Sequence, residues 1–165
     1  MNTLKTDIEI KILHFMLQKA RLCVNLAYVD KVLPLMQVDA MPGAENYIVG
    51  LMNLGGQSVP LIDLATRVGI ERTESYSLDT PVLLCKVAKH SVGIIVDRII
   101  GLSDIKENEL QKNPELNTED SLFSGTVPFK LDISLMVNMQ KILNVKITGQ
   151  EEIQPENVNA TAHMD

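Results

Sequence analysis

The chain contains no tryptophan, and only 4% of its 165 residues are aromatic. Its hydrophobic core must therefore be built mainly from Val, Ile, Leu and Met. Apolar residues as a whole reach 45% of the sequence, which is enough for a globular core. The length fits one ordinary domain or two very small ones.

Long apolar runs are also missing. No stretch approaches the ~20 apolar residues that a membrane-spanning helix needs. The N-terminal residues MNTLKTDIEIK carry acidic side chains where a secretory signal peptide has its apolar segment. We therefore expect a cytoplasmic protein that does not insert directly into a membrane.

Basic side chains are outnumbered. The formal net charge is −6, and residues 148–165 contain four acidic residues but neither Lys nor Arg. Binding to a phosphate backbone needs clustered basic side chains, so the composition argues against a nucleic-acid partner. Because residues 148–165 also lack apolar periodicity, we expect them to form an acidic disordered tail.

Groups with the spacing of a metal site are absent from the sequence. Cys23 and Cys85 lie in apolar segments, which predicts two buried free thiols; a disulfide or a redox pair is the less favoured alternative. His14, His90 and His163 do not have the spacing of metal ligands. The sequence therefore predicts no metal and no cofactor.

Two carboxylates could be read as an acid–base pair. Asp63 and Asp97 each follow an apolar strand-like segment, but no nucleophile or oxyanion donor accompanies them. We interpret each as a residue that caps a turn or accepts hydrogen bonds from backbone amides. No residue is predicted to be catalytic.

The most informative segment is residues 47–64, YIVGLMNLGGQSVPLIDL. Two apolar runs are joined by Gly55, Gly56 and Gln57, and Gly-Gly is suited to the positive φ angles of a tight turn, so the segment predicts a β-hairpin. Its second strand should run into a short helical turn capped by Asp63 or Thr66. A hairpin without a nucleophile, metal ligands or a phosphate loop favours binding over chemistry.

With this hairpin included, the chain predicts about ten short strands in two sets of five, separated by a polar connector at 69–80. The apolar phase changes between Ile12 and Leu13, which suggests a bulge or the true start of the first strand. Residues 26–33 have helical spacing and should form one or two helical turns, followed by a short strand at 35–38. A second short helix should begin at Asn138.

Four segments resemble the CheW-like domain, the adaptor of bacterial chemosensory arrays. They lie in the expected order between residues 11 and 144. They are FML at 15–17, the hairpin at 47–64, VGIIVDRIIGL at 92–102 and SLMVNMQKIL at 134–143. The hairpin is similar to the family pattern G-x-x-N-L-R-G-x-x-x-P-x-x-D-L.

The resemblance implies an all-β fold of two five-stranded SH3-like barrels with short connecting helices. It places one domain at 1–147, with barrels at about 8–68 and 78–147 that interlock. It also implies a non-enzymatic adaptor between the cytoplasmic tip of a chemoreceptor and the regulatory domain of a histidine kinase, with other CheW-like domains as further partners. Such a protein is recruited to membrane-associated receptor arrays. The alternative is a divergent adaptor in a pilus, surface-sensing or polar-localisation system, and a small barrel enzyme or nucleic-acid binder is less favoured still.

Two places carry the predicted partner-binding residues. In the first, Val29, Val32 and Leu33 either pack inward or border a groove between the barrels that would receive a receptor helix. The second is the hairpin tip with Asn53, Gly55 and Gly56. Gly55 stands where the family usually has Arg, and Lys31 stands where it often has Glu, so we expect altered binding to standard partners. Four methionines, Met36, Met41, Met52 and Met136, are interpreted mainly as core residues.

Overall fold

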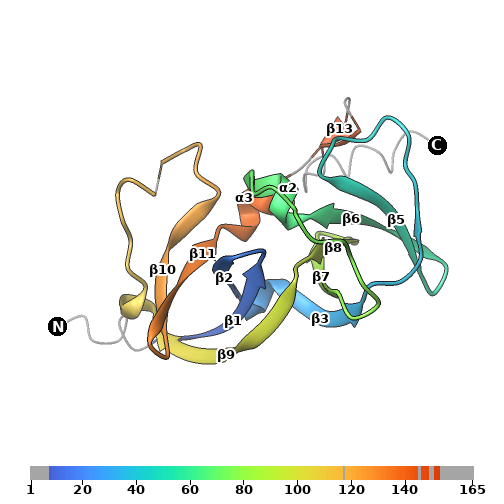
Figure 1. Ribbon diagram of the computed structural model, residues 1–165. Helices are drawn as coiled ribbons and strands as arrows, with labels where there is room; N and C mark the ends of the chain where they lie inside the picture. Colours follow the sequence, from blue (N-terminus) through green and yellow to red (C-terminus); the bar gives the residue numbers. More distant parts are fainter. Residues whose placement is uncertain (1–7, 117, 145, 149–150, 153–165) are drawn as a thin grey trace.

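The computed structural model describes residues 8–116, 118–144, 146–148 and 151–152 (Figure 1). Strands dominate this part of the chain, and the helices are short. The strands form two main sheets, which confirms the predicted all-β fold. Each sheet curls into a small barrel, and the two barrels lie next to each other (Figure 1).

The first barrel is a five-stranded sheet in the order β10-β11-β2-β1-β9. An isolated bridge between Gln111, which follows β9, and Thr126 of β10 joins the two edges of this sheet. A short 3-10 helix, η2 (Glu107–Glu109), precedes that bridge. The strands are β1 (Glu9–Leu17), β2 (Ala20–Asn25), β9 (Arg98–Lys106), β10 (Phe123–Phe129) and β11 (Asp132–Val137).

The second barrel is a six-stranded sheet in the order β3-β7-β8-β6-β5-β4. β3 and β4 follow each other directly in the chain and occupy the two edges, so residues 29–39 act as one bent strand that closes the sheet. The strands are β3 (Val29–Pro34), β4 (Val38–Asp39), β5 (Ile48–Leu54), β6 (Gln57–Asp63), β7 (Pro81–Val87) and β8 (His90–Ile95).

The barrels are not consecutive segments of the chain. We expected one barrel at 8–68 and the other at 78–147, but β1 pairs with β9 and β2 with β11, whereas β7 pairs with β3 and β8 with β6. Two of these pairings, β11 with β2 and β6 with β8, are parallel, and each joins a strand from the first half of the chain to one from the second half. That division by sequence is therefore wrong. Apolar alternation locates a strand but does not identify its partner.

Strand β1 explains the change of apolar phase between Ile12 and Leu13. The strand is continuous there, and both residues are buried because its two faces meet different cores. Leu13 packs in the large core between the barrels, while Ile12 packs in a smaller core inside the first barrel. The irregularity in pairing with β9 falls later, between His14 and Phe15, so the expected bulge position is wrong.

The largest core joins the two barrels. It contains buried side chains from β1 and β2 of the first barrel and from β5–β8 of the second, together with α2 and α3. Cys23 and Cys85 are fully buried free thiols, as predicted, and burial raises the pKa of each to about 12. Met52 and Met136 are core residues, whereas Met36 is 37% exposed.

Both short helices occur where the sequence places them. Helix α2 (Leu64–Val68) begins after Asp63, whose Oδ1 accepts a 3.0 Å hydrogen bond from the Ala65 amide. Helix α3 (Met139–Leu143) begins after Asn138, whose Oδ1 accepts from the Lys141 amide. These are ordinary N-caps.

Residues 26–33 do not form the expected helical turns. A 3-10 turn, η1, covers only Leu26–Tyr28, and β3 starts at Val29. Pairing with β7 satisfies the backbone of β3 and overrides the helical spacing of its valines. The strand expected at 35–38 is limited to Val38–Asp39 in β4.

The expected disordered tail begins too early. β12 (Lys146–Thr148) and β13 (Glu151–Glu152) form a two-stranded antiparallel pair. The expectation is therefore wrong at residues 148 and 151–152. Residues 149–150 and 153–165, which were also included in it, lie outside the described residues.

Candidate partner-binding surfaces

The β5–β6 hairpin has a two-residue turn at its tip. Leu54 pairs with Gln57, and between them Gly55 and Gly56 adopt φ angles of +59° and +87°. Positive φ at both central positions is the geometry that matches the twist of a hairpin. Asn53 Oδ1 accepts a 2.8 Å hydrogen bond from the Gly56 amide and fixes the turn.

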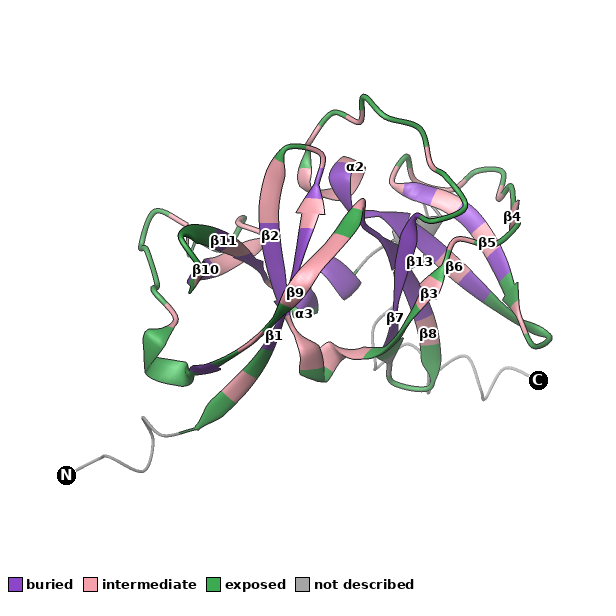
Figure 2. Cartoon of the chain, turned by 60° about the horizontal axis from the view of Figure 1, so that its bottom comes forward, coloured by how far each residue is buried: buried purple, intermediate pink, exposed green. Residues whose placement is uncertain are grey.

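Strand directions bring a second hairpin tip to the same end of the second barrel. β6 and β8 are parallel, with Leu61 opposite Gly93, so both strands start at one end of the barrel. The β5–β6 and β7–β8 turns therefore share that end, and both lie at the lower side of the second barrel in Figure 2. We call this surface the hairpin end. It comprises Lys31, Asn53, Gly55, Gly56, Lys86, Lys89 and His90.

Strand β3 supplies the other predicted site residues. Val29 packs against the large core between the barrels and Leu33 against the smaller core of the second barrel, and both are partly buried. Val32, in contrast, is 45% exposed. Val29, Val32 and Leu33 therefore do not share one face, as helical spacing would require. Of the three, only Val32 is exposed.

A second exposed apolar side chain lies at the junction of the barrels. Leu102 of β9 is 62% exposed and stands opposite Leu13, whereas Val32 stands opposite Leu83. Paired residues project from the same face of a sheet. Because Leu13 and Leu83 both belong to the core between the barrels, Leu102 and Val32 lie at its margin.

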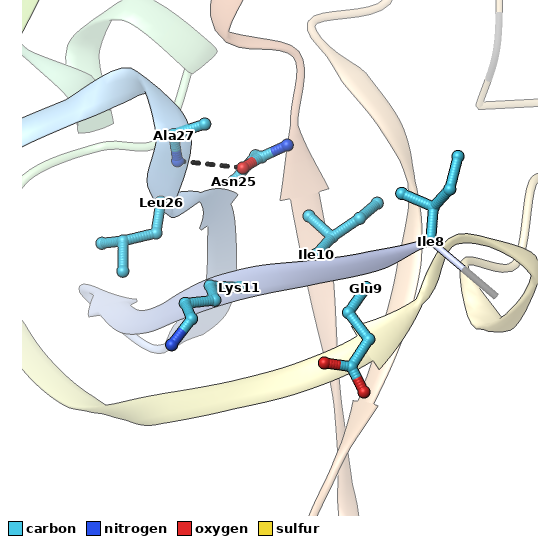
Figure 3. A pocket seen from close by; sticks show the side chains of 7 residues that line it. All are labelled: Ile8, Glu9, Ile10, Lys11, Asn25, Leu26 and Ala27. Atoms are coloured by element: carbon cyan, nitrogen blue, oxygen red, sulfur yellow. Dashed lines mark hydrogen bonds between the residues drawn. The ribbon is translucent and has the colours of Figure 1, made fainter.

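An open groove lies where the chain passes from the first barrel to the second. Its volume is about 480 Å³, and it lies between the start of β1 and turn η1 (Figure 3). Asn25 Oδ1 accepts a 2.9 Å hydrogen bond from the Ala27 amide and holds η1 in place. The lining residues are Ile8, Glu9, Ile10, Lys11, Asn25, Leu26 and Ala27.

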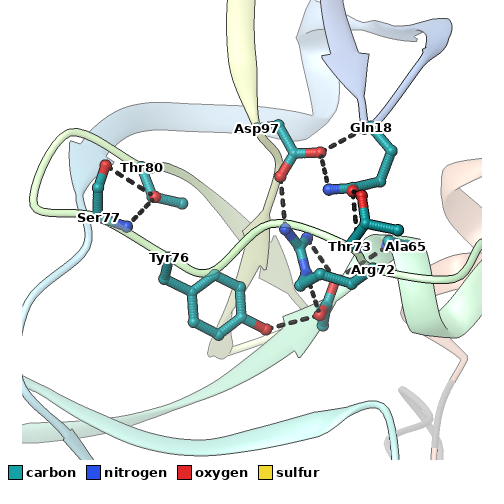
Figure 4. Close-up of polar contacts among 9 residues, drawn as sticks. Gln18, Ala65, Arg72, Thr73, Tyr76, Ser77, Thr80 and Asp97 are labelled. Carbon is teal, nitrogen blue, oxygen red and sulfur yellow. Dashed lines mark hydrogen bonds and ion pairs between the residues drawn. The ribbon is translucent and has the colours of Figure 1, made fainter.

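Asp63 and Asp97 are brought together by a residue that the sequence did not single out. The Arg72 side chain donates from Nε and Nη2 to Asp63, at 2.8 and 2.9 Å, and from Nη1 to Asp97 at 2.6 Å (Figure 4). Tyr76 Oη adds a 2.6 Å hydrogen bond to Asp63. We call these four residues the Arg72 cluster.

The Arg72 cluster also reaches the first barrel. Gln18, in the turn between β1 and β2, donates to Asp97 from its backbone amide and its side chain. Its Oε1 accepts from the amide and hydroxyl of Thr73 (Figure 4). The cluster thus ties the connector at 69–80 to both barrels. Nothing in the spacing of the connector sequence indicated this, since its polar residues show no periodicity.

The protonation equilibria of the cluster fit a structural role. Burial alone would raise the pKa of Asp63, but hydrogen bonds from Arg72 and Tyr76 outweigh it and hold that pKa below its usual range. Burial and the bond to Asp63 raise the pKa of Tyr76. A carboxylate held ionised by a bidentate arginine is a poor general base, which agrees with the interpretation of Asp63 as a cap.

His14 is a buried titratable residue of the first barrel. Its Nδ1 and Nε2 atoms lie 2.7 Å from the hydroxyls of Ser134 and Ser103, and its ring stacks on Phe129 at 3.9 Å. Burial, with a smaller effect from the charge of Arg21, lowers the pKa of His14 to about 4. This histidine is therefore neutral at physiological pH and serves packing.

The described residues contain no group of three or more His, Cys, Asp or Glu that could hold a metal ion. Among the residues that the structure describes, no helix has the length and apolar character needed to cross a membrane. What the molecule does offer is a groove, an apolar margin between two barrels and two adjoining hairpin tips. Surfaces of this kind can receive a partner protein.

Comparison with known proteins identifies that class more closely. The family model of the CheW-like domain matches residues 11–146, so the chain belongs to the CheW-like domain family. This confirms the resemblance drawn from the four sequence segments.

Individual relatives agree with the family match. The chain is 26% identical over 145 residues to the chemotaxis protein CheW of Thermotoga maritima, covering 88% of this chain and 94% of the relative. It is 26% identical over 109 residues to a probable chemotaxis protein CheW of Rhizobium etli, covering 66% and 70%. The predicted function of a chemotaxis coupling adaptor is thereby supported, and the pilus or surface-sensing alternative is not favoured.

A solved structure confirms the fold. The scaffolding protein TtCheW from Thermoanaerobacter tengcongensis aligns with a TM-score of 0.75 at 24% sequence identity, covering 88% of this chain and 98% of that one. The two-barrel architecture described above is thus the architecture of a known CheW protein.

Proposed function

We propose that this protein couples the cytoplasmic tip of a chemoreceptor to the regulatory domain of a histidine kinase. It would work without chemistry, in the cytoplasm, where membrane-associated receptor arrays recruit it. The observation that supports this proposal is the match to the CheW-like domain over residues 11–146.

The receptor tip would bind at the junction of the barrels. Val32 and Leu102 expose apolar surface there at 45% and 62%. A helical hairpin that places apolar residues against this margin gains the hydrophobic contribution of burying both side chains.

The kinase domain would bind at the hairpin end. Gly55 and Gly56 form a turn in which an added Cβ would meet nothing within 4 Å, so the tip is open to a partner. A regulatory domain with the same fold can present its own barrel end to this surface, and other CheW-like domains can do so as well. Each contact can be small, because array avidity multiplies weak contacts.

The critical experiment asks whether the two partners bind at once. Calorimetry would measure the affinity of the protein for a receptor-tip fragment, for a kinase regulatory domain, and for each in the presence of the other. We expect binding of both with little mutual competition. If neither partner binds, or if they exclude each other, the protein is not the proposed coupler.

A further inference from the structure

The hairpin end carries positive charge in a protein whose formal net charge is −6. Residues 80–96, which include the β7–β8 hairpin, contain Lys86, Lys89 and His90 but no Asp or Glu, and residues 46–62 contain no charged residue at all. Because both hairpin turns lie at this end, it combines an uncharged tip with a basic one. The imbalance follows from where the topology places these segments.

Lys31 of β3 adds to the same surface. It stands opposite Leu84 in the pairing of β3 with β7, and Lys86 lies two residues further along β7 on the same face. Diagonal neighbours of this kind are ~7 Å apart, within the reach of long side chains. Lys31, Lys86 and Lys89 are all exposed. We call these three residues the lysine patch.

Nothing in the described part of the chain neutralises the lysine patch by direct contact. The ion pairs found there involve Arg21 and Arg72, and no lysine of the patch takes part in one. Asp30, the neighbour of Lys31, lies at an irregularity of the β3–β7 pairing between Val29 and Lys31 and takes no part in those ion pairs. Three cations at one end of a barrel then attract carboxylates during encounter and favour partners of opposite charge.

We propose that the lysine patch is a docking surface for an acidic protein surface, with carboxylates facing Lys31, Lys86 and Lys89. If the acidic surface belongs to the kinase regulatory domain, this proposal rests on the proposed function. An extended polyanion such as DNA or an anionic bilayer fits less well, since the net charge of the whole chain repels it and three lysines make few phosphate contacts.

The first experiment needs no natural partner. The ¹⁵N-labelled full-length protein is titrated with a synthetic glutamate-rich peptide and, separately, with the same peptide carrying glutamine in place of glutamate. We expect amide shifts that cluster on β3 and the two hairpin turns with the acidic peptide, and that vanish as salt is raised. Shifts that are absent, spread over the surface or equal for both peptides would overturn the proposal.

Charge reversal provides the matched comparison. Lys86→Glu with Lys89→Glu removes the basic tip, while Lys19→Glu with Lys112→Glu makes the same change in net charge at two exposed lysines of the first-barrel region. We expect the first pair to weaken peptide binding about tenfold and the second to leave it nearly unchanged. Equal losses in both pairs would show that net charge alone matters and would overturn the proposal.

The second experiment separates this inference from the proposed function. Affinity for a kinase regulatory domain is measured by calorimetry at low and high salt for the natural chain and for both pairs of substitutions. We expect the natural chain to lose affinity with salt and the Lys86/Lys89 variant to lose both affinity and salt dependence. If no kinase domain binds while the peptide shifts remain, the proposed function fails and the lysine patch stands. If the protein binds DNA or anionic vesicles more tightly than it binds the glutamate-rich peptide, the lysine patch is not a protein-docking surface.

Discussion

The Arg72 guanidinium holds the Asp63 carboxylate by two parallel hydrogen bonds, Nε to Oδ2 at 2.8 Å and Nη2 to Oδ1 at 2.9 Å. Both side chains are largely buried, at 15% and 6% exposure. A bidentate pair of this kind fixes direction as well as distance. It therefore anchors the connector at 69–80 to the end of β6, where Asp63 also caps helix α2.

Replacing Arg72 by Met should destabilise the protein by roughly 2–4 kcal/mol, because the buried Asp63 carboxylate loses its main partner. Urea denaturation would measure the change. Glu74→Gln, an exposed substitution in the same connector, should stay within about 0.5 kcal/mol. The double variant Arg72→Met with Asp63→Asn should recover part of the loss. An Arg72→Met protein as stable as the natural one would show that the cluster contributes nothing.

This cluster marks the limit of what the sequence could predict. The hairpin at 47–64 was accessible because Gly-Gly has a specific backbone meaning at a turn, and the structure gives both glycines positive φ. The caps at Asp63 and Asn138 were accessible for the same local reason. Arg72, by contrast, pairs with one carboxylate 9 residues before it and another 25 residues after it, and only the fold brings the three side chains together.

Two predictions from the sequence were wrong because long-range contacts decided the outcome. The spacing of Val29 and Val32 satisfies both a helix and an edge strand, and pairing with β7 decided between them. The assignment of strands to barrels failed because β1 and β2 pair with strands about 80 or more residues later in the chain. Local pattern predicts an element, whereas long-range pairing decides its environment. The partner-binding residues on β3 and the hairpin tip accordingly stay predictions.

His14 predicts how stability depends on pH. Its folded pKa of about 4 lies below its ordinary value of 6.5, so the unfolded chain binds a proton that the folded chain excludes. The contribution of His14 to the free energy of unfolding should be fully present above about pH 6.5. It should fall as the pH drops toward 4, by at most roughly 3 kcal/mol. Asp63, whose pKa is also lowered, adds a further loss at more acidic pH.

The measurement is urea denaturation between pH 4 and pH 7.5. His14→Gln is the test variant, because it keeps hydrogen-bonding capacity between Ser103 and Ser134 but does not titrate. We expect it to be less stable at neutral pH and to show a flatter pH profile in this range. An identical slope in both proteins would assign the acid sensitivity to other groups.

Val32 and Val29 should respond differently to the same substitution. Val32→Asp places a charge on a side chain that is 45% exposed, so the protein should stay folded and lose affinity for a receptor-tip fragment. Val29→Asp places a charge against the large core and should mainly destabilise the fold. Thermal unfolding and calorimetry, run on both variants, separate the two effects. Unchanged receptor binding by a folded Val32→Asp protein would remove β3 from the binding surface.

Gly55 supports the last prediction, because the resembling family usually carries Arg at this position of the hairpin. A missing charge-assisted contact whose partner stays buried costs roughly 1–3 kcal/mol, or one to two decades in affinity. We therefore expect the natural chain to bind a standard kinase regulatory domain weakly. Gly55→Arg should strengthen that binding.

The turn can accommodate the substitution at modest cost. Gly55 has a φ of +59°, and a non-glycine residue there costs about 1 kcal/mol. Gln18, Ala88 and Lys130 adopt φ angles of +56°, +55° and +56° in this same protein, which shows that its fold accepts side chains in this conformation. An added Cβ at Gly55 would also meet no atom within 4 Å.

Three variants separate the charge from the backbone. Gly55→Ala carries the conformational cost alone, Gly55→Gln adds a long polar side chain without charge, and Gly55→Arg adds the guanidinium. All three should lose similar stability in thermal unfolding, so only a specific gain in affinity for Gly55→Arg reports the contact. If the natural and Arg proteins bind a standard kinase domain equally while fully folded, Gly55 is not part of the coupling surface. In that case the lysine patch on the neighbouring hairpin and β3 would remain as the source of positive charge at this end of the barrel.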